Sequence, residues 1–224
     1  MDWRRFRCKI LPVCFVWKPQ SLLLQLFLVH QLSNIFSDAF ILDGSPTSFA
    51  QFPRWHAGLN GTFSLRFRTR EPNGLLLYTD DGSTFDFFEV KLVEGNARLR
   101  FNLGGGAAII SAGKNLHDSQ WHTLKITRNA EETVLTVDDD VQKRLTAGPD
   151  YLFGNATTNG AVFIGGLPQW YGSKLSLLAL PSAFYEPRFQ GAVKEIVYAS
   201  NDGVPKEQEL QESQGIRTAS LRPH

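Results

Sequence analysis

Apolar and polar residues alternate with a period of two through most of this chain, in short runs separated by turn residues. In the segment from Thr62 to Thr69, for example, Phe63, Leu65 and Phe67 alternate with polar residues. Successive side chains of a β-strand point to opposite faces, so this pattern is typical of a strand with one buried and one solvated face. The pattern constrains the chain more than any single motif does, because it favours sheet over helix along most of its length.

Runs of this kind recur at intervals of about ten residues, as expected for an antiparallel sandwich or barrel. The predicted strands are 62–69, 74–79, 85–93, 97–103, 107–112, 121–128, 133–139, 161–166 and 191–199. No internal repeat is visible, which favours one domain over residues 40–200. No segment after residue 40 has helical spacing of apolar residues, and the polar stretch 201–224 predicts a flexible C-terminal tail.

The first 39 residues have the pattern of a secretory signal peptide. A basic region ends at Lys9, the apolar run 21–29 follows, and Ser37 and Ala39 provide small residues for cleavage before Phe40. A membrane anchor is the alternative, but Lys18 and Pro19 interrupt the apolar stretch, and neither half reaches the ~20 residues that cross a bilayer. We therefore predict a secreted or cell-surface product without a membrane span.

Charge and cysteine content exclude several functions. The chain has a formal charge of +1, but residues 1–39 hold five of its 23 Lys and Arg and two of its 22 Asp and Glu, so the remainder carries −2. A near-neutral body argues against a nucleic-acid partner, which would need a basic face. Both cysteines, Cys8 and Cys14, lie within the predicted signal, so the domain has no disulfide, thiol nucleophile or cysteine metal site.

Seven fragments together resemble the laminin-G/LNS family over residues 40–200. In order, they read FSLRFRT, GLLLYTDD, DFFEVKLVEGNARLRFNLG, LHDSQWHTLKITR, LTVDD, VFIGGLP and FQGAVKEI. Within the family, SFAQFPRW and the long stretch from GGLP to PRFQG are most similar to the first LNS repeat of neurexins. The resemblance implies an all-β, concanavalin A-like jelly-roll of two antiparallel sheets. It also implies an extracellular adhesion module that binds proteins or glycans at cell–cell contacts, including synapses.

The resemblance also implies a Ca²⁺ site at the loop rim. Asp86 corresponds to the family's metal-binding aspartate, Leu103 to a residue that contributes a backbone carbonyl, and Thr157 to a position in the ligand-bearing loop. One carboxylate with carbonyls and water molecules gives a weak site of the extracellular type. The alternative is that Asp86 only caps a turn.

An enzyme is disfavoured. Asp86 and Glu89 are the nearest carboxylate pair, but residues three apart on a strand face opposite sides of the sheet and do not flank one glycosidic bond. His117 and His122 have no companions in a recognisable nucleophile motif. No catalytic residue is predicted.

Two surfaces are candidates for partner binding. Trp170 and Tyr171 lie in an expected loop, where exposed aromatic residues are favoured interface anchors, although they could fold back over the end of the sandwich. Phe184 and Tyr185 present the same two alternatives, whereas Trp121 is expected to fill the core.

The rival function is a lectin for heparin or other sulfated glycans. It would use a basic patch, whose candidate members are Arg66, Arg68, Arg70, Arg98 and Arg100.

Two sequons mark candidate glycosylation sites. They begin at Asn60 and Asn155 and would carry glycans on surface loops if the chain enters the secretory pathway.

Overall fold

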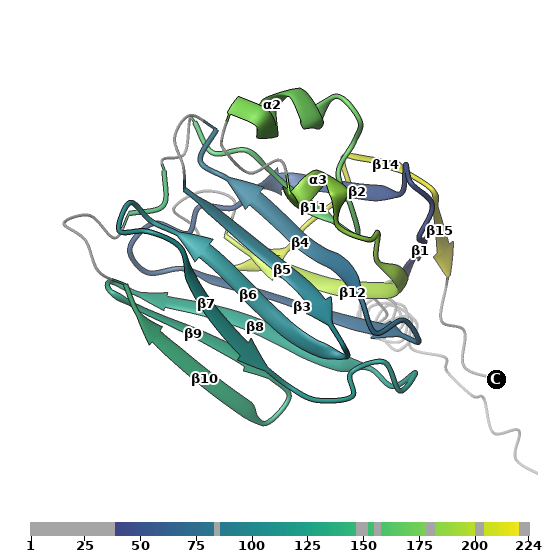
Figure 1. Ribbon diagram of the computed structural model, residues 1–224, viewed down its shortest axis with the longest axis horizontal. Helices are drawn as coiled ribbons and strands as arrows, with labels where there is room; N and C mark the ends of the chain where they lie inside the picture. Colours follow the sequence, from purple (N-terminus) through teal and green to yellow (C-terminus); the bar gives the residue numbers. More distant parts are fainter. Residues whose placement is uncertain are drawn as a thin grey trace, which may run out of the picture. The chain divides into compact units, whose positions relative to one another are not determined.

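Two antiparallel sheets make up most of the structure, a computed structural model that describes residues 39–82, 86–146, 152–154, 158–177, 182–199 and 204–219. Figure 1 shows the two sheets packed against each other, with most of their strands labelled. The predicted two-sheet antiparallel sandwich is confirmed. All nine predicted strands are present, with ends that differ by a few residues.

Sheet A has the spatial order β10-β9-β8-β3-β12-β1-β15, with β13 paired to β12. Its strands are β10 (Asp140–Leu145), β9 (Glu132–Val137), β8 (His122–Asn129), β3 (Thr62–Thr69), β12 (Gln190–Tyr198), β1 (Ala39–Asp43), β15 (Ile216–Ala219) and β13 (Lys206–Glu207). Sheet B has the order β14-β2-β11-β4-β5-β6-β7. Its strands are β14 (Glu212–Gln214), β2 (Phe49–Arg54), β11 (Ala161–Ile164), β4 (Gly74–Asp80), β5 (Phe87–Val93), β6 (Asn96–Asn102) and β7 (Ala108–Ala112).

The main core lies between the inner faces of the two sheets. Phe63, Leu65 and Phe67 of β3 are fully buried there, as their alternation predicted, and Phe88 and Phe101 contribute from sheet B. Burying a side chain of this size stabilises the fold by roughly 1.5–3 kcal/mol relative to leaving it exposed. This core joins the two sheets without a disulfide.

A second apolar cluster covers part of the outer face of sheet B. It consists of Phe49, Leu75, Tyr78, Phe163, Leu167, Tyr171, Leu175 and Ala183. The last residues in this set come from two short helices, α2 (Tyr171–Leu177) and α3 (Ser182–Tyr185), which lie beside β4 and β11 in Figure 1. The expectation that residues after 40 contain no helix is therefore wrong for this segment.

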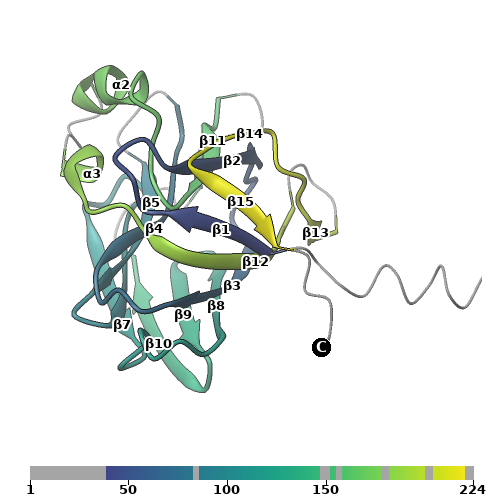
Figure 2. The ribbon, with the colours of Figure 1, turned by 90° about the vertical axis from the view of Figure 1, so that its right-hand side faces the viewer.

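The C-terminal residues also differ from their prediction. Composition indicated a flexible tail from residue 201, but residues 206–219 form β13, β14 and β15. Backbone pairing explains the difference: Glu212–Gln214 pair with β2, and Ile216–Ala219 pair with β1. Figure 2 shows β15 beside β1, with β12 on the other side of β1. Both sheets therefore gain a terminal strand from this segment.

Candidate functional site

Asp86 lies directly before β5 at the loop rim, half-buried beside a second carboxylate. The backbone N–H of Asp81 donates to the carbonyl of Asp86 at 3.0 Å, and the Asp81 side chain is only 3% exposed. Burial raises the pKa of Asp86 to about 6, and the charge of Asp81 adds to this effect. The Gly104 N–H and the Arg128 guanidinium act in the opposite direction. The carboxylates of Asp86 and Asp81 therefore lie close enough to affect each other, with the Arg128 guanidinium as a nearby positive charge.

The register between β5 and β6 gives the position of Leu103. Phe87 is opposite Asn102, so the next position outward sets Leu103 opposite Asp86. The third expected ligand, Thr157, lies outside the described residues. Among the residues that are described, no three or more His, Cys, Asp and Glu side chains cluster at one point. The described part of the rim therefore contains the carboxylates of Asp86 and Asp81, and the Ca²⁺ site remains a prediction.

Arg128 is a member of this neighbourhood that sequence reasoning missed. It is 2% exposed, and burial lowers its pKa to about 10, an effect that Asp86 opposes. Its guanidinium donates to the carbonyl of Ala130 at 3.1 Å and lies 5.8 Å from the centre of the Phe88 ring. The sequence could have indicated its burial, because Arg128 continues the alternation of inward-facing residues that includes Leu124 and Ile126 on β8.

Asp80 is the centre of a buried polar cluster on the outer face of sheet B. It is 1% exposed, and its Oδ2 accepts hydrogen bonds from Tyr171 at 2.7 Å and Tyr78 at 3.2 Å. Its Oδ1 accepts from Lys174 Nζ at 3.2 Å and from the Gly82 N–H at 2.9 Å. Burial, followed by the charge of Asp80, raises the pKa of both tyrosines. The buried cluster fixes α2 to the end of β4.

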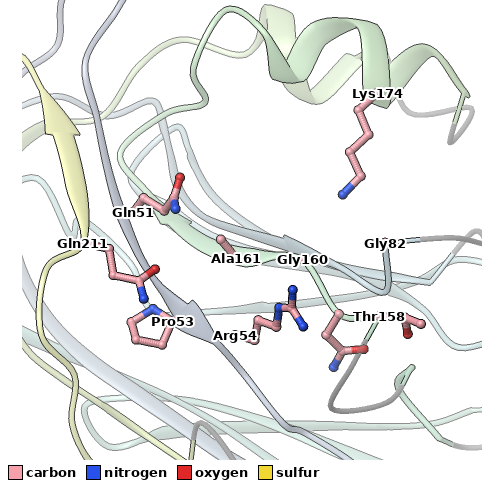
Figure 3. Close-up of a pocket in the computed structure, with 10 residues that line it drawn as sticks. Gln51, Pro53, Arg54, Gly82, Thr158, Gly160, Ala161, Lys174 and Gln211 are labelled. Carbon is pink, nitrogen blue, oxygen red and sulfur yellow. The ribbon is translucent and has the colours of Figure 1, made fainter.

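An open pocket lies beside this cluster, between β2, β11 and α2. Its volume is about 610 Å³. Figure 3 shows Lys174 reaching into it from α2 and Arg54 from the end of β2, with Gln211 on the C-terminal side. Gly82 closes one end with φ of +78°, and a Cβ there would lie 2.0 Å from the Thr158 carbonyl oxygen. The turns at residues 80–82 and 158–160 therefore pack in direct backbone contact.

The two aromatic residues expected to anchor a partner have different environments. Trp170 is 58% exposed, whereas Tyr171 is 2% exposed and bonded to Asp80. The prediction of a surface role for Tyr171 is wrong, because it begins α2 with its ring against Phe163. Tyr185 is 80% exposed. Exposed aromatic area is therefore provided by Trp170 and Tyr185.

The candidate basic patch divides between the two outer faces. Arg66 and Arg68 lie on the outer face of sheet A, whereas Arg98 and Arg100 lie on that of sheet B. The two sheets pack through their inner faces, so their outward residues point to opposite sides of the molecule. The prediction of one patch formed by all five arginines is therefore wrong.

Sheet A nevertheless has a basic cluster of its own. Trp121, expected in the core, is half-buried on the outer face. The charged groups of Arg68 and Lys194 lie 5.0 Å from its ring centre, and that of Arg66 lies at 5.9 Å. A β-bulge after Lys194 places Glu195 where it contacts both Arg66 and Lys194. We call Arg66, Arg68, Lys194 and Trp121 the sheet A cluster.

The other predicted residues are the carboxylate Glu89 and the two sequon asparagines. Glu89 is buried on sheet B and pairs with Arg100 at 3.3 Å. Burial raises the pKa of Glu89, an effect that Arg100 opposes. Asn60 is exposed in the turn before β3, whereas Asn155 lies outside the described residues. Within the described ranges, no helix is long and apolar enough to cross a membrane.

Comparison with known proteins finds similarity to laminin G domains and to neurexins. A family model for the laminin G domain matches residues 67–201. Neurexin 1 of Drosophila melanogaster is 53% identical over 186 residues, which are 83% of this chain and 10% of that protein. Human Neurexin-2 is 32% identical over 189 residues, which are 84% of this chain and 10% of that protein. The chain spans about a tenth of the length of these relatives.

Solved structures share the fold at lower identity. The LG1-3 region of the laminin α2 chain superposes with a TM-score of 0.67 at 19% identity, over 81% of this chain and 34% of that one. Domains LG4-5 of the mouse laminin α1 chain give the same TM-score and identity, over 82% and 47%. The two-sheet jelly-roll is therefore shared with laminin domains.

Proposed function

The chain belongs to the laminin G domain family, and on that premise we propose that it is an extracellular recognition module that binds protein or glycoprotein partners at cell–cell contacts, including synaptic ones. The observation that carries the proposal is the 53% identity to Drosophila Neurexin 1 over most of the chain. Its action is binding, without turnover, since the carboxylate pair Asp86 and Glu89 does not form a catalytic arrangement.

Secretion follows from the signal-like residues 1–39. Cleavage before Phe40 would leave Phe40–Asp43 paired with β12 and residues 40–42 paired with β15, so most of β1 would remain in the mature sheet. Expression of the full chain in secretory cells, followed by N-terminal sequencing of the medium, should give Phe40 as the first residue. Retention of the whole chain in the membrane fraction would contradict this part of the proposal.

The rim around Asp86 would bind Ca²⁺ and couple it to partner binding. Asp86 would supply its carboxylate and Leu103 its carbonyl, and the bound ion would neutralise the charge that Asp86 and Asp81 share. Metal binding requires the deprotonated carboxylate. Since the pKa of Asp86 is raised to about 6, Ca²⁺ affinity should fall as pH decreases through this value.

The test is calorimetric titration of the secreted protein with Ca²⁺ at pH 7.5 and pH 5. Wild type should bind at pH 7.5 and more weakly at pH 5, and Asp86→Asn should not bind at either. Asp139→Asn, in an exposed turn, is the matched control and should bind as wild type does. Equal binding by wild type and Asp86→Asn would make Asp86 a turn residue, without affecting the proposed adhesion function.

A partner protein would contact the exposed aromatic side chains beside α2 and α3. Trp170 and Tyr185 combine large area with high exposure, as interface anchors do. Binding of the secreted protein to the surface of cultured neurons should fall in Trp170→Ala and Tyr185→Ala. Equal binding by both variants and wild type would exclude this surface.

Sulfated glycans are a second candidate, supported by the sheet A cluster. A groove of about 580 Å³ adjoins it, and its charged lining residues are Arg68, Arg70 and Arg217 with the carboxylates Asp43 and Glu71. The strand register brings Arg68 and Arg217 to the same groove. Ala192 lies opposite Arg68, Ile41 lies opposite Ala192, and Arg217 lies opposite Ile41. The planar guanidinium of arginine can donate two hydrogen bonds to the oxygens of a sulfate group, as it does to those of a phosphate.

Heparin chromatography separates this candidate from the first. Arg68→Gln should elute at lower salt than wild type, whereas Arg98→Gln, exposed on the opposite sheet, should elute with wild type. An equal decrease in both variants would indicate a general charge effect. Elution of wild type at low salt would exclude the candidate.

A further inference from the structure

Two exposed leucines lie next to each other on neighbouring loops. Leu59 is 45% exposed and Leu152 is 48% exposed. An isolated antiparallel bridge joins Gly58 to Phe153, and the next position along places Leu59 opposite Leu152. Single exposed leucines are common on protein surfaces, but two that adjoin form an apolar patch whose removal from water is favourable. We call Leu59 and Leu152 the leucine pair.

The core and a neighbouring turn hold the backbone on both sides of the leucine pair. Phe153 is fully buried, with its ring centre 4.9 Å from that of Phe88. On the other loop, the carbonyl of Leu59 accepts a hydrogen bond from the Ala130 N–H at 2.9 Å, in the turn between β8 and β9. A group that covers the leucine pair therefore does not have to order a loop first, which would weaken its binding.

The first sequon adjoins the leucine pair. Asn60 follows Leu59 directly and begins the sequence Asn60-Gly61-Thr62. Asn60 is exposed, as the acceptor of a bulky N-glycan must be. A Cβ at Gly61 would lie 2.4 Å from the Ala57 carbonyl oxygen, so this tight bend requires glycine. The glycan acceptor is therefore held immediately beside the apolar patch.

We propose that the N-glycan on Asn60 covers the leucine pair with its first two N-acetylglucosamine units. One face of each pyranose ring consists of C–H groups, and each N-acetyl group ends in a methyl. These groups pack against the leucine side chains and remove apolar surface from water, while the sugar hydroxyls stay solvated. This role of the glycan rests on the proposed secretion of the chain, because sequons are modified in the secretory pathway.

Covalent attachment favours the protein's own glycan over a separate partner at this patch. A group on a short tether has an effective concentration on the order of millimolar, so a weak contact is enough to keep it in place. A free partner would have to displace it. The leucine pair is therefore shielded in the secreted protein, and the exposed Trp170 and Tyr185 stay the surface proposed for partners.

Nuclear Overhauser effects test the contact directly. The protein is secreted with ¹³C-labelled leucine and valine methyl groups and with Asn155→Gln, which removes the second sequon. Mass spectrometry should find a glycan on Asn60, and Overhauser effects should connect the N-acetyl methyl protons to the methyl groups of Leu59 and Leu152. Removal of the glycan with peptide-N-glycosidase should shift the signals of both leucines. The signals of Val141, 59% exposed on β10, are the control and should not move.

Thermal melts in the same Asn155→Gln background test whether the contact stabilises the fold. Glycan removal should lower Tm by about 2 °C, since two leucines lose their cover. In Leu59→Ser/Leu152→Ser the same treatment should lower Tm by less, because the apolar surface is absent. Val141→Ser should respond to glycan removal as the parent protein does. The enzyme converts Asn60 to aspartate in every sample, so the new charge does not affect the comparison.

Three results would overturn the proposal. The first is secreted protein with an unmodified Asn60, and the second is a glycan on Asn60 without Overhauser effects to either leucine. The third is an equal loss of Tm in the parent protein and in Leu59→Ser/Leu152→Ser. Each of these leaves the proposed recognition function unaffected. Retention of the chain inside cells would instead contradict the proposed secretion, and glycosylation of Asn60 with it.

Discussion

The outer faces of the two sheets have similar strand patterns and different environments. On sheet A, outward residues such as Arg66 and Arg68 remain solvated around Trp121. On sheet B, outward residues of β4 and β5, among them Tyr78, Asp80 and Glu89, are almost completely buried. The segment that carries α2 and α3 accounts for much of this difference, because its Tyr171 and Leu175 pack on sheet B.

The comparison shows that the same kind of residue has different energetic roles on the two faces. A charge on the sheet A face keeps its hydration, so its contacts contribute little to stability. A buried charge on the sheet B face, such as that of Asp80 or Glu89, has lost its hydration and depends on its partners. Substitutions of buried charged residues on sheet B should therefore affect folding, and substitutions on the outer face of sheet A should affect binding.

The largest expected effect is that of Asp80→Ala. The change removes the acceptor of Tyr78, Tyr171, Lys174 and the Gly82 N–H at once. Breaking a buried pair from one side costs about 3–5 kcal/mol, so urea denaturation should show a loss near 3 kcal/mol. Asp139→Ala, in an exposed turn, should change the free energy of unfolding by less than about 0.5 kcal/mol. Similar values for the two variants would contradict the proposed contrast between buried and exposed carboxylates.

Tyr171→Phe tests the same cluster with a smaller change. It removes one hydroxyl, which donates to Asp80 at 2.7 Å and accepts from Lys174 at 3.0 Å, and keeps the ring against Phe163. A loss of about 1–2 kcal/mol is expected in thermal denaturation. Trp170→Ala, next in sequence but 58% exposed, is the matched control and should lose less. The reverse order would mean that α2 is held by Trp170.

Much of the fold could be predicted because the strands of the sandwich core have one buried face. The alternation of Phe63, Leu65 and Phe67 reports that face directly. The terminal strands β14 and β15 gave no such signal, because they pair through backbone groups with largely exposed side chains. Helix α2 was missed for a related reason: its seven residues are too few to show a helical period.

The residues of the rim could be predicted from the sequence, whereas those of the pocket could not. Asp86 and Leu103 were identified through family resemblance, and the β5–β6 register sets them opposite each other. Their role with Ca²⁺ stays a prediction. The pocket is lined by Arg54, Lys174 and Gln211, which come from three widely separated parts of the sequence. Only the packing of β2, α2 and the C-terminal segment brings them together, so no local pattern could indicate it.

Glu89→Gln should change how stability depends on pH. Burial raises the folded-state pKa of Glu89 above its ordinary value, so its native form retains a proton that the unfolded chain releases. The stabilising contribution of this proton is complete below the unfolded pKa, near 4.3, and is lost as pH rises through the folded pKa. Denaturation of wild type from pH 4 upward should show this loss, and Glu89→Gln should reduce it. An unchanged pH dependence would show that Arg100 fully compensates the buried charge.

The smallest effect is expected on sheet A, from Arg68→Gln. Its guanidinium lies 5.0 Å from the Trp121 ring centre, but Lys194 lies at the same distance and would remain. A cation–π contact at an exposed site contributes about 0.5–1 kcal/mol, so with Lys194 and Arg66 still beside the ring the loss should be under about 0.5 kcal/mol. Removing both cations in Arg68→Gln/Lys194→Gln should cost more than the sum of the single changes, because each compensates for the other. Strict additivity in denaturation curves would show that the two cations act independently, and that the sheet A cluster is not a single electrostatic unit.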